Sequence, residues 1–287
     1  MISKIKFHKV LLKKKFPLAI SRGVKGDSYN LFLSYEKDGL IGWGEAAPGK
    51  NENAETVEEI KDQLEAFLEH GIESKTTEEL NQRAKQMGIA PCAYAALDIS
   101  LWDWKAKKAK LPLHQLLGFP QPTVPTSLTL GIIPPEQVRE RVQLMFKNSS
   151  AKALKIKLGS PHGIEADQQM FSKVLESVKK YQLKIRVDAN GGWSTKEAIF
   201  MMKWLAERGV EYIEQPLEEG KESELQYIYS NRPLPIYIDE SCRYADNVGK
   251  WANYIDGINM KLMKCGGITE ALLIISNAKK YKLKTMI

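Results

Sequence analysis

The stretch LKIKLGS, residues 154–160, has the form that later parts of the chain repeat: an apolar strand that carries charged side chains. Successive side chains on a β-strand point to opposite faces, so residues two apart share a face. Lys155 and Lys157 therefore leave the same face of a strand whose other residues are mostly apolar. Two buried ammonium groups side by side are costly unless a neighbouring group neutralises or uses them. The stretch predicts a polar site at the end of a buried strand.

Four later segments place charged residues at strand ends in the same way. Three of them end in carboxylates, which are Asp188 in IRVDAN (185–190), Glu214 in YIEQP (212–216), and Asp239 and Glu240 in IYIDES (236–241). The fourth segment, INMKLMKCGG (258–267), carries Lys261 and Lys264. A single aspartate after a strand is more often a helix cap than a ligand. Lysine, three acids and lysine on successive strands are not explained by capping alone.

From about residue 124 onward, strand-like and helix-like segments alternate. We expect strands at 124–130, 152–157, 183–188, 210–214, 235–239, 255–260 and 283–287, and helices at 134–147, 164–180, 195–208, 244–252 and 267–281. This alternation predicts parallel strands joined by right-handed crossovers, which bring all the carboxyl ends of the strands to one side. The predicted fold is α/β, with a (β/α) barrel of the modified TIM type whose active site lies at those ends.

The first third of the chain predicts a separate α+β domain at residues 1–120, followed by the barrel domain at 121–287. We expect strands at 2–13, 28–36 and 40–48, a loop at 16–27, and helices at 54–69, 92–108 and 111–118. Asp98 and Asp103 lie in one of these helices, but residues five apart do not share a helix face. A surface ion pair or a cap is therefore favoured over a metal pair.

Seven barrel strands can be counted up to Ile287, although a closed barrel of this type needs eight. Either a C-terminal part lies beyond these residues, or the barrel closes differently. An open seventh strand would leave an unpaired edge, which favours the first alternative.

Composition narrows the functional classes. The 287 residues have a formal net charge of +7, from lysines that are mostly scattered along the chain, which is typical of a solvated surface. Nucleic-acid binding is not favoured, because aromatic and basic residues are not interleaved. No stretch approaches the ~20 apolar residues of a membrane-spanning helix, and no signal-peptide pattern is present. Three cysteines without paired spacing favour a cytoplasmic protein.

The acidic residues predict a metal site. Three carboxylates without histidine or cysteine suit Mg²⁺, or Mn²⁺ as a substitute, better than zinc. A metal there could hold a substrate carboxylate and stabilise the charge that forms when the neighbouring carbon loses a proton. Lys157 and Lys261 come from strands well separated around a barrel, so they could flank that carbon on opposite faces. Such a pair suits an epimerase or racemase, provided that the base lysine is neutral.

These residues resemble the muconate-lactonising-enzyme subgroup of the enolase superfamily. The resemblance covers nearly the whole chain and includes GWGEAAP (42–48), AALDISLWDWKAK (95–107), LKIKLG (154–159), VDANGGW (187–193), IEQPL (213–217), IDES (238–241) and NMKLMKCGG (259–267). It implies a capping role for the N-terminal domain and an enediolate intermediate. It implies that Asp188, Glu214 and Asp239 bind Mg²⁺ and that Lys157 and Lys261 are the acid/base pair. Lys155 would support Lys157 or the enolate oxygen, and Glu240 would lie next to the metal ligands without binding the metal.

Within the subgroup, NMKLMKCGGITEA (259–271) together with KIKLG (155–159) looks similar to dipeptide epimerases of the L-Ala-D/L-Glu type. This resemblance implies a dipeptide substrate, a homo-oligomer, and a capping loop at 16–27 that closes over the substrate. Arg22 in that loop could pair with an acidic substrate side chain, although a solvated arginine is an equal alternative. Thr129 and Asn190 are further candidates for substrate contact. The family's Asp-x-Asp segment at the eighth strand, which holds the substrate ammonium group, has no counterpart here.

Other functions remain open. The same site could serve an o-succinylbenzoate synthase, a muconate cycloisomerase or an N-succinylamino acid racemase. Outside enzymes, the chain could be a degenerate barrel that only binds a ligand. The two lysines favour an enzyme, because a pure binding protein has no use for two opposed amines.

Overall fold

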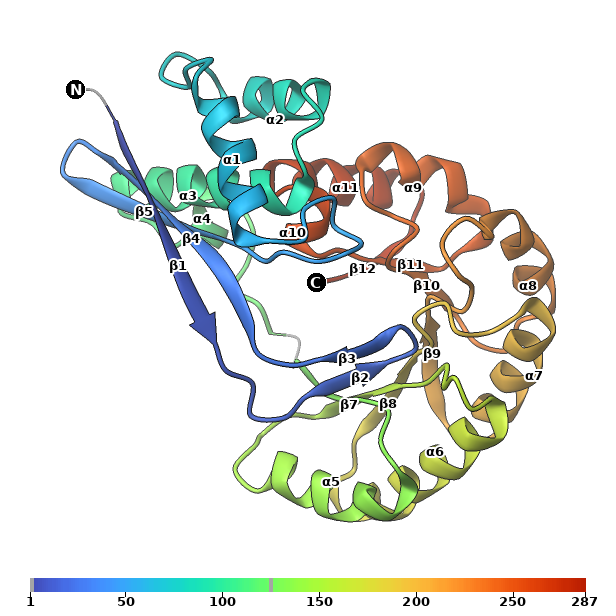
Figure 1. The fold of residues 1–287 in the computed structure, drawn as a ribbon. Coiled ribbons are helices and arrows are strands. Elements are labelled where there is room, and N and C mark those ends of the chain that lie inside the picture. Colours follow the sequence, from blue (N-terminus) through green and yellow to red (C-terminus); the bar gives the residue numbers. More distant parts are fainter. Residues whose placement is uncertain (1–2, 124–125) are drawn as a thin grey trace.

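The computed structural model describes residues 3–123 and 126–287, so the first residues of the predicted strands 2–13 and 124–130 lie outside it. The N-terminal domain is an antiparallel sheet in the order β1-β4-β5, packed against helices (Figure 1). Its strands are β1 (Lys4–Leu12), β4 (Ser28–Lys37) and β5 (Leu40–Ala46), and its helices are α1 (Val57–Leu68), α2 (Thr77–Gln86), α3 (Pro91–Ala109) and α4 (Leu113–Leu116).

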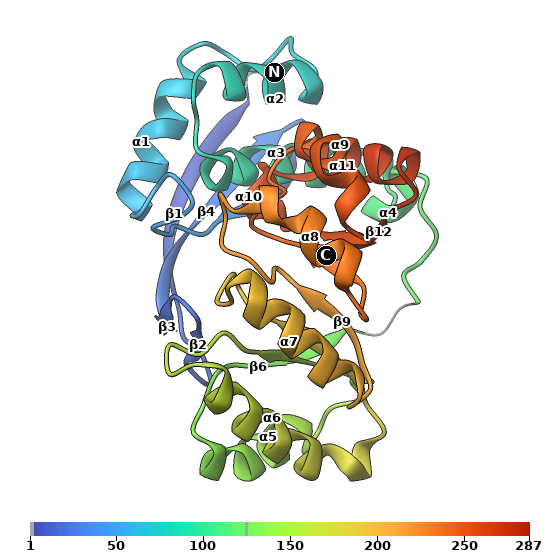
Figure 2. The same cartoon turned by 90° about the vertical axis from the view of Figure 1, so that its right-hand side faces the viewer.

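The rest of the chain forms one curled parallel sheet in the order β12-β11-β10-β9-β8-β7-β6. The strands are β6 (Ser127–Leu130), β7 (Ala153–Lys157), β8 (Lys184–Asp188), β9 (Val210–Glu214), β10 (Ile236–Ile238), β11 (Gly257–Asn259) and β12 (Lys284–Met286). The helices are α5 (Val138–Phe146), α6 (Ile164–Val178), α7 (Thr195–Ala206), α8 (Leu225–Asn231), α9 (Ala245–Trp251), α10 (Leu262–Cys265) and α11 (Ile268–Lys280). Figures 1 and 2 show these helices around the outside of the sheet, except α10, which lies against α3 of the N-terminal domain. The predicted barrel-type fold with an N-terminal α+β domain is confirmed.

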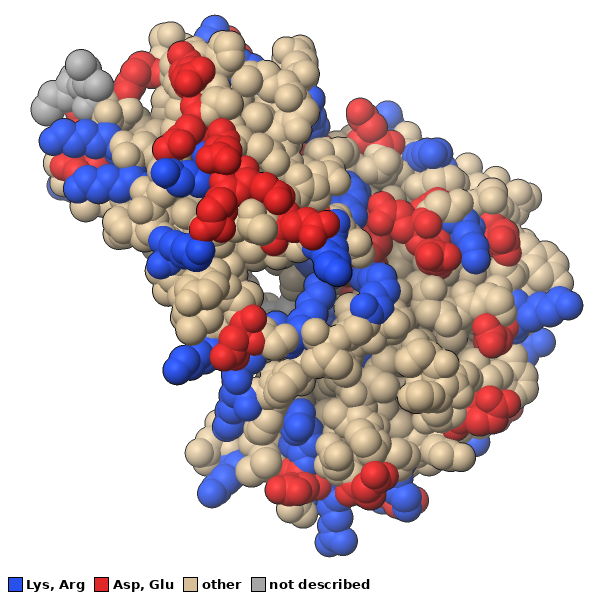
Figure 3. Space-filling view, in the orientation of Figure 1, with Lys and Arg blue, Asp and Glu red and all other residues tan. Residues whose placement is uncertain are grey.

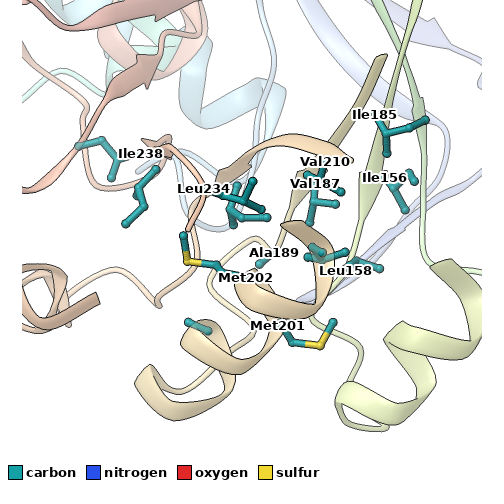
Figure 4. Packing of buried hydrophobic residues seen from close by; sticks show 14 of the residues in the cluster. Ile156, Leu158, Ile185, Val187, Ala189, Met201, Met202, Val210, Leu234 and Ile238 are labelled. Atoms are coloured by element: carbon teal, nitrogen blue, oxygen red, sulfur yellow. The ribbon is translucent and has the colours of Figure 1, made fainter. Parts of the chain in front are cut away.

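Strand alternation places the charged side chains inside the curl. Ile156 and Leu158 lie in the apolar core with Val187 and with Met201 and Met202 of α7, on the helix side of the sheet (Figure 4). The residues between them, Lys155 and Lys157, therefore face the opposite side. The same segment thus supplies both the core and the charged interior.

The predicted loop at 16–27 is wrong, because this segment contains an antiparallel hairpin of β2 (Leu18–Ile20) and β3 (Gly23–Lys25). Gly23 has φ +123, a conformation that glycine adopts without steric strain and that allows the tight turn. The hairpin reaches from the N-terminal domain across the barrel strands (Figure 1). Its Ala19 carbonyl accepts a 2.8 Å hydrogen bond from the N–H of Ile132, which follows β6.

Asp98 joins the two domains. It is fully buried in α3, and its carboxylate accepts hydrogen bonds from the N–H of Thr269 (3.0 Å) and from the Thr269 hydroxyl, at the start of α11. Asp103 instead accepts from the N–H of Trp43 (2.8 Å) and pairs with Lys107 (2.7 Å). The two aspartates therefore act as a cap and as an ion-pair partner, in agreement with the sequence-based expectation.

Asp98 should give the protein a pH-dependent stability. Burial raises the pKa of Asp98 from its ordinary 3.8 to about 6. A raised carboxyl pKa means that the folded state binds the proton more tightly, so this group's contribution to stability falls as the pH rises from about 4 to about 6. The difference between the ordinary pKa and the pKa in the folded protein corresponds to a change in unfolding free energy of roughly 3 kcal/mol.

The Asp98→Asn variant lacks this titration. We expect the difference in unfolding free energy between the wild type and Asp98→Asn to change across this pH interval. The wild type should become less stable relative to the variant as the pH rises. Urea unfolding of both proteins between pH 4 and pH 7.5 measures it. Parallel pH curves for the two proteins would show that Asp98 keeps an ordinary pKa.

No helix within residues 3–123 and 126–287 is both long and apolar enough to cross a membrane.

Candidate active site

Three carboxylates meet at the carboxyl ends of three adjacent strands. Asp188 ends β8, Glu214 ends β9, and Asp239 directly follows β10. All three are fully buried, and each offers an oxygen within 4.8 Å of the others. The parallel register pairs Asp188 with Glu214, so both side chains point to the same side of the sheet. The sheet therefore gathers acids that are far apart in the sequence.

The three carboxylates fit a hard divalent cation. They supply oxygen donors from three strands, and no histidine or cysteine belongs to the group. Asp188, Glu214 and Asp239 could hold such a cation.

Lysines lie on both sides of the carboxylates. Lys157 at the end of β7 forms an ion pair with Asp188, and Lys155 contacts Glu214 (3.0 Å). Lys261, just after β11, forms an ion pair with Asp239 from the other side. Because the sheet order is β7-β8-β9-β10-β11, the three acid-bearing strands lie between the two lysine-bearing ones. Lys157 and Lys261 thus approach the three carboxylates from opposite directions.

Ion pairs govern the protonation of these lysines. Burial lowers the pKa of Lys155, but the charges of Glu214 and a second carboxylate outweigh it, so the pKa lies above its ordinary value. The pKa of Lys261 is raised in the same way, mainly by Asp239. Against the effect of burial, Lys264 and Lys261 hold the pKa of Asp239 well below its usual range. The surrounding carboxylates therefore favour the ammonium form of Lys155 and Lys261.

Arg22 of the hairpin contacts the barrel, and its side chain is also partly exposed to solvent. Its guanidinium donates to the carbonyl of Asn190 (2.8 Å) and pairs with Glu240, and the hydroxyl of Ser21 also donates to the Asn190 carbonyl (2.9 Å). The side-chain amide of Asn190 lies 3.3 Å from Glu240. The predicted residues Arg22, Asn190 and Glu240 are thus brought together where the hairpin meets the strand ends.

Thr129 lies in β6 in register with Lys155 of β7, so its side chain faces the same side of the sheet. This position is at the edge of the charged cluster.

Sequence reasoning missed two residues that hold the carboxylates in place. The side-chain amide of Asn259 donates to Glu214 (2.6 Å), and Gln215 accepts a hydrogen bond from the N–H of Asp239 (2.9 Å). Asn259 lies two residues before Lys261, so strand alternation could have indicated it. Lys264, which the same segment carries, is buried and donates to the Asp239 carboxylate (2.6 Å).

Two open spaces lie near the strand ends. Figure 3 shows the molecule hollowed between the N-terminal domain and the barrel, with Lys and Arg side chains along one side. A separate cavity of about 450 Å³ lies beside the hairpin, and neither Lys157 nor Lys261 lines it. Its lining is mainly apolar and includes Ile20, Val24, Ile132, Ile133, Pro161 and Met170.

Family models match both parts of the chain. The mandelate racemase / muconate lactonizing enzyme N-terminal domain matches residues 2–118, and the enolase C-terminal domain-like family matches residues 137–287. The chain belongs to the enolase superfamily. Within this superfamily, it is 60% identical over 284 residues to a protein of a Flavobacteria bacterium named hydrophobic dipeptide epimerase, covering 99% of this chain and 81% of that relative.

Solved structures of the superfamily share the fold. A dipeptide epimerase from Enterococcus faecalis, complexed with Mg and the dipeptide L-Leu-L-Tyr, has a TM-score of 0.90 and 33% identity, covering 99% of this chain and 80% of that one. A substrate-liganded L-Ala-D/L-Glu epimerase from Bacillus subtilis has a TM-score of 0.91 and 25% identity, covering 98% and 80%.

Proposed function

We propose that this protein is a Mg²⁺-dependent dipeptide epimerase, an isomerase that inverts the α-carbon next to the carboxylate of a dipeptide. The observation that carries the proposal is the placement of Lys157 and Lys261 on opposite sides of the buried carboxylates. The names of the relatives and of the matching structures support it.

The proposed reaction uses the two lysines in turn. One of them, as the neutral amine, takes the α-proton, and the ammonium group of the other delivers a proton to the opposite face. Lys155 lies beside Lys157 and would contact the substrate carboxylate. A cation held by Asp188, Glu214 and Asp239 would supply the positive charge that favours ionisation of the carbon next to that carboxylate.

A dipeptide library in D₂O tests this function. With the protein and Mg²⁺, we expect a subset of dipeptides to gain one deuterium at the C-terminal α-carbon and to form a second diastereomer. Mass spectrometry detects the first change, and chromatography detects the second. If no dipeptide gains deuterium, the proposed function is wrong.

We favour dipeptides with hydrophobic side chains as substrates. Arg22, the cation that could hold an acidic side chain, is already paired with Glu240. The cavity beside the hairpin is mainly apolar, and the relative that is 60% identical carries the name hydrophobic dipeptide epimerase. Acidic dipeptides are the second candidate class, because Arg22 lies in the hairpin that covers the site and could exchange Glu240 for a substrate carboxylate.

Replacing Arg22 with alanine should separate these classes. If Arg22 binds acidic side chains, Arg22→Ala should raise KM for L-Ala-L-Glu by about 10-fold, the equivalent of one charge-assisted hydrogen bond, with less effect on L-Ala-L-Leu. If Arg22 only holds the hairpin against Asn190 and Glu240, KM should rise equally for both. Steady-state kinetics with the two dipeptides provide the comparison, and an equal rise would remove the acidic class.

Use of Mn²⁺ in place of Mg²⁺, assembly into a homo-oligomer and a cytoplasmic location belong to the same proposal, as does the division into domains at residues 120 and 121. The three cysteines are buried and free, which agrees with a reducing compartment.

A further inference from the structure

A buried carboxylate outside the acid cluster connects two strand ends of the site. Asp167 lies in the first turns of α6 and is 1% exposed. One of its oxygens accepts hydrogen bonds from the N–H of Gly159 (2.8 Å) and from the indole N–H of Trp193 (3.0 Å). The other accepts from the N–H of Ser160 (3.0 Å). One side chain therefore holds the turn after β7 and the segment after β8.

The turn after β7 is closely fitted to β8. Gly159 has φ +81, and a Cβ at this position would lie 2.4 Å from the carbonyl oxygen of Ala189. The N–H of Leu158 donates to the carbonyl of Asp188 (2.9 Å). Lys157 directly precedes Leu158 and Gly159. Its backbone is therefore fixed by the turn that Asp167 holds through hydrogen bonds to Gly159 and Ser160.

We propose that Asp167 is a positioning residue for Lys157, acting through the Gly159–Ser160 turn. Two of its three hydrogen bonds go to that turn. Lys261 is held by different elements, because it lies between β11 and α10. Of the two lysines, Asp167 should therefore affect the position of Lys157 and not that of Lys261. This inference rests on the proposed epimerisation by two lysines.

The Asp167→Asn variant tests this role. An amide has the size of the carboxylate, but its NH₂ group cannot accept a hydrogen bond, so at least one of the three donors loses its partner. A displacement of about 1 Å at a reacting group can lower a rate by about 100-fold. We expect α-proton exchange with D₂O to slow by 10-fold or more for the epimer that Lys157 deprotonates, and to stay near wild-type for the other epimer.

The ratio of the two exchange rates, measured separately with each pure epimer by ¹H NMR, is the decisive readout. Weaker metal binding or partial unfolding slows both epimers alike and leaves the ratio unchanged. Asp98→Asn is the matched control. Asp98 is also buried, and it accepts a hydrogen bond from the start of α11, which lies away from β7. This variant should not slow the epimer that Lys157 deprotonates, because the contacts of Asp98 lie on the Lys261 side of the sheet.

A second variant covers the case in which Asp167→Asn does not fold. Trp193→Phe removes only the indole donor, which shares its carboxylate oxygen with the N–H of Gly159, so it should shift the ratio in the same direction by a smaller factor. Equal slowing of both epimers in the folded variants would overturn the positioning role while leaving the epimerase function in place. If the wild type exchanges neither epimer of any dipeptide, the proposed function fails and this inference fails with it.

Discussion

The Lys261→Ala protein should interconvert no epimers, yet it should still exchange the α-proton of the epimer that faces Lys157. Lys157→Ala should show the same loss with exchange of the opposite epimer. The reason is geometric: β7 and β11 lie on either side of three acid-bearing strands, so each lysine reaches one face of the substrate. Loss of a general acid or base typically lowers a rate by about 10²–10⁴-fold.

¹H NMR in D₂O over long incubations measures both effects, as deuterium incorporation without inversion. Lys184→Ala is a suitable control, because this lysine starts β8, is exposed, and pairs with Glu211 away from the acids. It should retain wild-type rates. Epimerisation by Lys261→Ala at a near wild-type rate would contradict the two-base scheme. A one-base reaction, such as the dehydration of an o-succinylbenzoate synthase, would then become the better account.

The second large effect is expected from the metal-binding carboxylates. Asp239→Asn should weaken Mg²⁺ binding by at least about 100-fold, since even partners of metal ligands often contribute 10–100-fold to affinity. Asp239 is fully buried between Lys261 and Lys264, so the variant also leaves two ammonium groups without their carboxylate. Activity should fall in parallel.

Calorimetric titration with Mg²⁺, or electron paramagnetic resonance with Mn²⁺, measures the binding without reference to activity. Glu211→Gln is the matched control, because Glu211 lies in β9 at the end remote from the site and pairs with Lys184 and Arg186. It should bind the metal normally. Unchanged metal affinity in Asp239→Asn would remove Asp239 from the site.

The charged interior could be predicted from the sequence because strand alternation is a local property. Lys155 and Lys157 two apart, and acids at strand ends, were sufficient to predict that these side chains converge. The helix α2 was not predicted, because its buried face includes Thr77 and Asn81 and so lacks an apolar stripe. Its capping box of Thr76 and Glu79 was the available signal.

Contacts between distant segments could not be predicted. The pairing of Arg22 with Glu240 joins residues 218 positions apart, and only the hairpin's placement over the barrel brings them together. The sequence gives no local indication of Asp167, because its three partners follow two different strands. The protonation of the lysines also depends on which carboxylate each one meets: burial lowers the pKa of both Lys155 and Lys261, but Glu214 raises that of Lys155 and Asp239 raises that of Lys261 by more.

The most direct test of the central claim is the isotope content of the first product formed in D₂O. If Lys157 and Lys261 act on opposite faces, the lysine that delivers the proton never carries the one removed from the substrate. The account predicts that the inverted dipeptide formed by the wild-type protein with Mg²⁺ carries full deuterium at the α-carbon from the first turnover. Retention of substrate protium in that early inverted product would contradict it.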